Sequence, residues 1–101
     1  MDKRLIWSPE AVEDLEAIAE FIGRDSVFYA NAVVSKVLAV SRSLPEAPLI
    51  GRIVPELDDD QIRERFVYSY RLIYRVADNE ILVAAIIHGK RLIEGVVERF
   101  E

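Results

Sequence analysis

The spacing of the hydrophobic residues changes near the middle of the chain, and this change constrains the fold more than any other feature. Before residue 45, apolar residues recur at helical spacing in two stripes. After residue 61, they form alternating or continuous runs with the length of strands. The first stripe comprises Leu15, Ile18, Ala19 and Ile22, and the second comprises Ala30, Val33, Val34, Val37, Leu38, Ser41 and Leu44. The sequence therefore predicts two helices followed by a sheet.

Capping residues bound both predicted helices. Residues 8–10 (SPE) combine an N-cap serine, a proline at the first helical position and an acidic residue in the first turn. Gly23 ends the first helix, and Asp25 or Ser26 caps the second, which ends at the prolines 45 and 48. The connection is so short that the helices must form an antiparallel hairpin. Residues 45–61, rich in Pro and Asp, are predicted as a long loop, either a surface crossing or a functional segment.

The remaining segments supply the sheet. Strands are predicted at 3–7, 62–68, 70–76 and 81–88, with a hairpin turn at 77–80 and a weak helix signal in the tail. Segment 81–88 is apolar on both faces, as expected for a central strand. The order β-α-α-β-β-β predicts an α+β fold in a single domain, residues 1–101, with the helix hairpin on one face of a small, mostly antiparallel sheet.

The strand at 70–76 has two distinct faces. Leu72, Tyr74 and Val76 share one face, and Arg71 and Arg75 lie on the other. Burying arginines beneath the helices without partners would cost several kcal/mol each, on the order given for unpaired charges. We therefore expect the apolar face under the helix hairpin and both arginines on an open face of the sheet.

The composition is typical of a globular chain, since 51% of the 101 residues are hydrophobic and 31% are charged. No apolar stretch approaches the roughly 20 residues of a membrane span, and the first residues lack the apolar core of a signal peptide. We expect a cytoplasmic protein with no membrane contact. The absence of cysteine excludes disulfides and thiolate metal sites. The net charge of −5 arises in residues 1–60, which disfavours general nucleic-acid binding, while the rest is nearly neutral with local basic clusters.

Cations in and after the later strands carry the most chemical potential. Arginine pairs bind phosphate or carboxylate, and histidine is the side chain best suited to moving protons at neutral pH; His88 is the only histidine in the sequence. Together such groups could stabilise a cleaving phosphodiester, or they could form structural ion pairs and partner contacts; the residues alone leave both possibilities open. No phosphate-binding loop or hydrolase motif accompanies them. The cluster comprises Arg71, His88, Lys90 and Arg91, with Arg63 and Arg65 nearby in the strands.

Five short segments occur in an order and at a spacing typical of one family. They are WSPEA at 7–11 with Leu15 and Ile18, GR at 51–52 with VPE at 54–56, IRE at 62–64, YRLIYRV at 70–76 and HGKR at 88–91. On these segments the chain resembles the ParE/RelE superfamily of toxins from bacterial type II toxin–antitoxin systems, over nearly its whole length. The resemblance implies a helix hairpin backing a small sheet, and we expect neither cofactor nor metal.

The superfamily divides by target. RelE-like members cut mRNA on the ribosome with basic residues on the sheet, whereas ParE-like members inhibit DNA gyrase and are not nucleases. Arg71 and Arg91 match two arginines of RelE. However, Ile62 and Glu64 stand where RelE has two lysines, and Val97 stands where it has a catalytic tyrosine. The departures favour the ParE-like branch.

The resemblance therefore implies a ParE-like gyrase inhibitor that is not an enzyme. The alternative is a ribosome-dependent mRNA endonuclease with Arg71, His88 and Arg91 as catalytic candidates. A second alternative is a module of this fold that is not toxic and only binds an antitoxin. Seven cations are candidates for target inhibition: Arg63, Arg65, Arg71, Arg75, His88, Lys90 and Arg91.

The partner that the resemblance implies is a cognate antitoxin in a hetero-oligomeric complex, with nucleic-acid contact only through that antitoxin. An amphipathic antitoxin helix would bury apolar residues that we predict to face outward from the helix hairpin. These antitoxin-binding candidates are Ala17, Phe21, Phe28 and Val40. In the tail, Leu92, Val96, Val97 and Phe100 are predicted to offer apolar area to the target protein.

Overall fold

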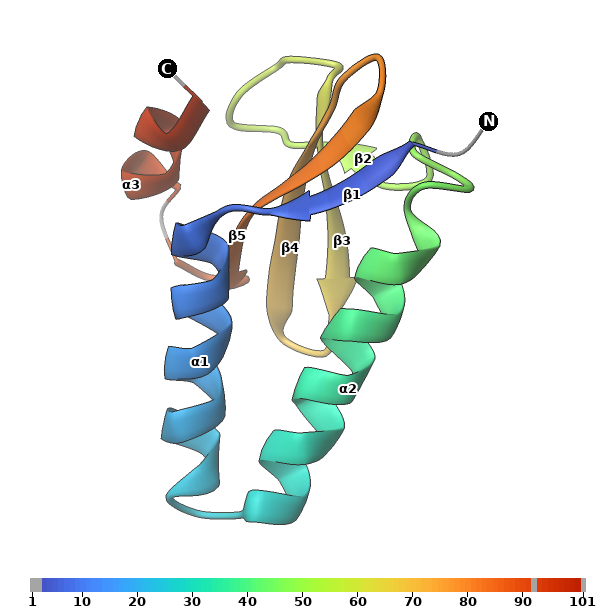
Figure 1. Cartoon of the computed structure of the whole chain (residues 1–101). Coiled ribbons are helices and arrows are strands. Elements are labelled where there is room, and N and C mark those ends of the chain that lie inside the picture. The colour runs from blue at the N-terminus through green and yellow to red at the C-terminus, as the bar shows by residue number, and fades with distance from the viewer. Residues whose placement is uncertain (1–2, 92, 101) are drawn as a thin grey trace.

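The fold is built on one five-stranded sheet in the order β1-β5-β4-β3-β2 (Figure 1). The computed structural model describes residues 3–91 and 93–100. The strands are β1 (Arg4–Trp7), β2 (Arg52–Ile53), β3 (Ile62–Val67), β4 (Tyr70–Val76) and β5 (Glu80–His88). The helices are α1 (Pro9–Gly23), α2 (Val27–Ser43) and the short α3 (Glu94–Val97), which continues into a 3-10 turn, η1 (Glu98–Phe100). The predicted α+β fold class is confirmed.

Neighbouring strands run antiparallel, apart from β1 and β5, which run parallel. Because β5 lies between β1 and β4, it is paired along both edges over residues 81–83, as its apolar sequence predicts. β2 was not predicted: it lies within the segment expected to be a loop. It pairs with β3 and places Arg52 beside Glu64.

Side-chain caps begin both long helices, as predicted. Ser8 Oγ accepts a hydrogen bond from the Ala11 amide at 3.1 Å, and Ser26 Oγ accepts one from the Tyr29 amide at 3.0 Å. α1 ends at Gly23, and Figure 1 shows the short turn that joins α1 to α2 in a hairpin. Within the described part of the chain, no helix is long and apolar enough to span a membrane.

The main core lies between the helix hairpin and one face of the sheet. It contains Leu72, Tyr74 and Val76 of β4, so the predicted orientation of this strand is confirmed. From α2, Val33 and Val37 pack against them with almost no exposed surface. Full burial of each such aliphatic side chain contributes about 1.5–3 kcal/mol.

The opposite face of the sheet is not open, and that prediction is wrong. A second core covers it, made of Val54, Ile62, Ile73, Ala85, Ile87, Ile93 and Val96. The loop after α2 supplies the first of these residues and the tail supplies the last two, so these segments replace the missing helix layer.

The tail does not present the apolar surface that we predicted for a target protein. Val96 is buried, and Val97 and Phe100 pack against the second core. Leu92 lies outside the described residues. The reason is that Ile73, Ala85 and Ile87 are apolar residues on this face as well, and the tail shields them from water.

Candidate functional site

The predicted cations do not gather on one face of the sheet. Arg63 and Arg65 pair across the ladder with core residues of β4 that lie beneath the helix hairpin, so they point to that side. Arg71 and Arg75 alternate with those residues and point to the opposite side. Residues 88–91 form a third group at the end of β5. The predicted cluster of cations is therefore divided, because the arginines of β3 and β4 lie on opposite faces of the sheet.

Arg71 is buried, with 4% of its surface exposed, so its predicted exposure is wrong. Its Nε donates to Glu64 Oε1 at 2.7 Å, and its Nη1 and Nη2 donate to the two oxygens of Glu56 at 2.9 and 2.8 Å. The hydrogen bonds with Glu56, followed by those with Glu64, raise the pKa of Arg71, and the same bond to Arg71 lowers the pKa of Glu56. Such bidentate, charge-assisted contacts are the strong form of the hydrogen bond.

Glu64 is the buried centre of what we call the arginine network: Arg52, Glu56, Glu64 and Arg71. The side chain of Glu64 has no exposed surface, and its second oxygen accepts a hydrogen bond from Arg52 Nε. A carboxylate in such a position is tolerated only when cations and donors surround it. The network joins β2, β3 and β4 to the loop that carries Glu56, so it holds this loop on the second core.

Two further cross-links hold the same loop. Tyr74 Oη donates to the Pro48 carbonyl at 2.8 Å and accepts from the Gly51 amide at 3.0 Å; burial raises the pKa of this tyrosine. Arg63 donates to three loop carbonyl groups. Only glycine fits at position 51, because a Cβ there would lie 2.6 Å from the Glu64 carbonyl oxygen. Arg63 thus has a structural role.

Arg75 also lies against another part of the chain. Its guanidinium carbon is 5.8 Å from the centre of the Phe100 ring, a cation–π distance. This contact fixes the end of the described tail to β4. The half-buried Arg65 lies on the helix side of β3.

The exposed members of the predicted set lie at the end of β5. His88 contacts the Tyr70 ring edge to face, with 5.7 Å between centroids, and its Nδ1 accepts from the Lys90 amide at 3.2 Å. Beside them a hollow of about 270 Å³ opens between α1 and β5, which we call the β5 hollow. It is lined by Asp14, Ala17, Ile18, Phe21, Tyr70, Ile86, Ile87, His88 and Arg91. Candidates from both halves of the sequence meet here.

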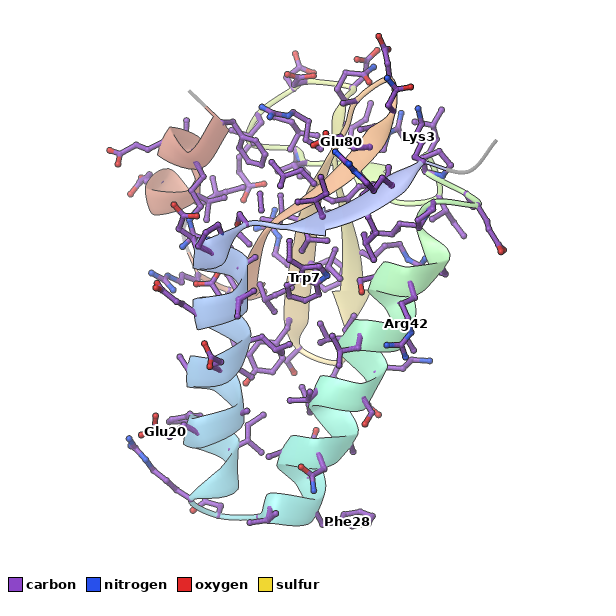
Figure 2. All side chains as sticks on the ribbon, in the orientation of Figure 1. Lys3, Trp7, Glu20, Phe28, Arg42 and Glu80 are labelled. Atoms are coloured by element: carbon purple, nitrogen blue, oxygen red, sulfur yellow. The ribbon has the colours of Figure 1, made fainter. Side chains whose placement is uncertain are left out.

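An apolar groove of about 350 Å³ lies on the opposite side of α1, between the two long helices. It is lined by Trp7, Val12, Leu15, Glu16, Ala19, Val34 and Leu38. Figure 2 shows Trp7 at the end of this groove, just below β1. The sequence did not indicate this groove. Leu15, Ala19, Val34 and Leu38 belong to the two helical stripes, which predict burial, whereas in the structure they are only half-buried. The signal in the sequence was the width of the two stripes, which extend beyond the residues that pack on the sheet.

The residues predicted to face outward from the helix hairpin do not form one surface. Val40 is 8% exposed and belongs to the main core, so its prediction is wrong; α2 packs this residue onto the sheet together with Val37. Phe21 and Phe28 are 66% and 86% exposed. Ala17 and Phe21 line the β5 hollow, whereas Phe28 lies at the far tip of the helix hairpin (Figure 2).

These places differ in the surfaces that they offer for binding. Among residues 3–91 and 93–100, no group of three or more acidic or histidine side chains is placed to hold a metal ion. In the arginine network the charges of two arginines and two glutamates cancel. The β5 hollow and the apolar groove offer apolar walls with polar rims. Such surfaces are suited to protein segments.

Comparison with known proteins places these features in a family. A model of the ParE toxin of the type II toxin–antitoxin system parDE matches residues 5–93. A curated protein named Toxin RelE2, from Caulobacter vibrioides, is 31% identical over 90 residues, which make up 88% of this chain and 98% of that protein. The family match spans the two long helices and the whole sheet, apart from the first residue of β1.

Solved structures share the fold at lower identity. A chain of the chromosomal ParDE system from P. aeruginosa superposes with a TM-score of 0.70 at 20% identity, covering 85% of this chain and 95% of that one. A mutant of the E. coli toxin RelE in the free state superposes with a TM-score of 0.67 at 17% identity, covering 98% and 94%. At these identities the likeness concerns the fold alone.

Proposed function

The chain belongs to the ParE toxin family of type II toxin–antitoxin systems, and on this premise we propose that it inhibits DNA gyrase and is neutralised by a cognate antitoxin. The observation that carries the proposal is the state of Arg71. A nuclease needs cations that are free to hold phosphate oxygens and the charge that develops on them. Arg71 instead directs Nε, Nη1 and Nη2 at the carboxylates of Glu56 and Glu64.

The other catalytic candidates for a nuclease point elsewhere. His88 pairs with Tyr70 across the ladder, and Arg71 pairs with Ile87, so the two side chains project from opposite faces. Arg91 lines the β5 hollow with His88. A phosphodiester would therefore meet a histidine and one arginine without the second arginine.

The residues that differ from RelE support the same conclusion. Glu64, at the position of a RelE lysine, is a buried acid within the arginine network, and Ile62 belongs to the second core. Val97 packs beside that core as well. General acid–base groups each contribute about 10²–10⁴-fold to such reactions, so their replacement by structural side chains leaves little basis for cleavage.

A supercoiling assay tests the gyrase proposal directly. We expect purified toxin to block supercoiling of relaxed plasmid by gyrase, and the antitoxin to reverse the block. Induced cells should form filaments with intact transcripts. Codon-specific mRNA cuts that appear with the wild type and vanish in His88→Ala, with gyrase unaffected, would overturn the proposal.

We infer that the antitoxin docks a helix in the apolar groove. Among the known structures of this fold is a toxin–antitoxin complex, RelBE2 from Mycobacterium tuberculosis, with a TM-score of 0.62. An open groove between two helices with apolar walls fits the apolar face of an amphipathic helix. Leu38→Glu should weaken antitoxin affinity at least tenfold, since it places a charge in the desolvated groove. Phe28→Glu, at the hairpin tip, is the matched control and should change affinity less than twofold; the reverse result would relocate the antitoxin helix.

The second candidate is a RelE-like mRNA endonuclease. It is favoured by the name of the curated relative, Toxin RelE2, and by the accessibility of His88 beside Arg91. Mapping of transcript ends after induction separates it from gyrase inhibition. A chain that binds antitoxin tightly but shows neither activity would instead be a non-toxic binding module.

A further inference from the structure

The outer edge of β5 continues beyond its neighbour. β1 pairs with β5 only from Glu80 to Val83, so among the described strands none pairs with the outer edge of residues 84–88. An uncovered strand edge is a template on which another chain can add a strand. What occupies the backbone groups of this edge therefore decides what it can bind.

Side chains from distant segments close the first half of the edge. Asp14 Oδ2 accepts a hydrogen bond from the Ile86 amide at 3.0 Å. Arg99 Nη1 donates to the Ala84 carbonyl at 2.9 Å and to Asp14 Oδ2 at 2.7 Å. These contacts satisfy the Ala84 carbonyl and the Ile86 amide, where α1 and the tail approach the sheet.

The next two backbone groups along this edge, the Ile86 carbonyl and the His88 amide, are available to a partner. The Gly89 amide donates to the Ser69 carbonyl at 2.7 Å, which sets residues 87 and 89 in the positions that bond to β4. By alternation, the backbone groups of residues 86 and 88 turn away from β4. The Ile86 carbonyl and the His88 amide therefore face outward as one acceptor and one donor, which is the repeat that an added strand needs.

The β5 hollow lies beside this donor–acceptor pair. Figure 1 shows the first part of α1 next to the end of β5, and Ala17 and Phe21 form an apolar wall. His88 and Arg91 line the hollow and are exposed, and the exposed Lys90 stands between them in the sequence. Asp14, the acid in the lining, is already held by Arg99 and a backbone amide. The polar rim of the hollow is thus positive on a protein with net charge −5.

We propose that the β5 hollow binds a short extended segment of a partner polypeptide in which an apolar side chain is followed by carboxylates. The segment pairs with the Ile86 carbonyl and the His88 amide, in the manner of β-strand addition. Its apolar side chain packs against Phe21, and its carboxylates meet Arg91 and Lys90. The complementarity of charge selects an acidic segment. The site goes beyond the proposed function, because it does not depend on which target the toxin inhibits.

The test uses the full chain, labelled with ¹⁵N, and the capped peptide Ac-TVLEEE-NH₂ as the probe. Binding should shift the amide signals of Ile86, Ile87 and His88 and slow hydrogen exchange of the His88 amide at least fivefold at saturation. Arg91→Glu should weaken binding at least tenfold. Arg42→Glu, the same charge change on α2 (Figure 2), should alter it less than twofold.

Two further probes separate strand addition from plain charge attraction. Peptides N-methylated at successive backbone positions should include one that does not bind, because it lacks the donor for the Ile86 carbonyl. Ac-TVLKKK-NH₂ should bind at least tenfold more weakly than the acidic peptide. Equal binding of both peptides, full tolerance of N-methylation, or no response of the His88 amide up to millimolar peptide would overturn the proposal. Gyrase inhibition is measured separately, so failure of one idea does not affect the other.

Discussion

Replacement of Arg71 by alanine should strongly destabilise the protein, although the sequence predicts Arg71 to be an exposed cation. The change removes the cation that lies between Glu56 and Glu64. Glu64 has no exposed side-chain surface, so its carboxylate would remain buried, and Arg52 would be the one cation of the arginine network still paired with it. Removal of one partner from a buried pair costs about 3–5 kcal/mol. The Glu56 contact adds little, because that side chain is 40% exposed and solvent screens it.

Urea and thermal unfolding, followed by circular dichroism, measure this cost. A loss of about 3 kcal/mol is a large part of the roughly 5–15 kcal/mol that stabilises a domain. It should lower Tm by about 10 °C or more in a chain of this length. The matched control is Arg24→Ala, which removes an exposed arginine from a helical pair with Glu20 and should cost less than about 0.5 kcal/mol.

A double variant shows whether the cost comes from the stranded carboxylate. Arg71→Met combined with Glu64→Leu replaces the buried ions by apolar groups of similar size, and it should be more stable than Arg71→Ala. If Arg71→Ala unfolds within about 1 kcal/mol of the wild type, which is the range of exposed ion pairs, the structural role of the network is refuted. Arg71 would then be available for a target.

Three other expectations concern the same elements. Because Arg71 lowers the pKa of Glu56, the stability from this contact is present above the unfolded-state pKa of about 4.3 and is lost as pH falls through the lower folded value. The urea midpoint of Glu56→Gln should therefore fall less steeply with decreasing pH than that of the wild type. Equal slopes for the two proteins would contradict this. Val40→Asp should cost more than about 2 kcal/mol by burying a charge in the main core, whereas Phe21→Asp should cost less than about 0.5 kcal/mol; similar Tm values would reverse these assignments. Gly51→Ala should lower Tm, because its Cβ meets backbone at 2.6 Å, and an unchanged Tm would show that the loop yields.

Local chemistry determined much of the fold before any tertiary contact was considered. The Ser8 and Ser26 caps, the helical stripes and the alternation in β4 depend on residues within a few positions of one another, and the structure has each of them as predicted. The resemblance to the ParE/RelE superfamily implied the same arrangement, a helix hairpin packed on a sheet. Alternation also assigned Arg71 correctly to the face that lies away from the helices.

The tertiary structure alone decided what covers each face. Periodicity indicates which side chains point the same way, but not which segment of the chain will lie over them. The loop after α2 carries Val54 into the second core and Glu56 onto Arg71, and this converts a predicted surface cation into a buried one. The splay of the two helices likewise left an apolar groove where the stripes predicted a closed core. Both outcomes depend on contacts between residues far apart in sequence, whose geometry is fixed only when the elements pack together.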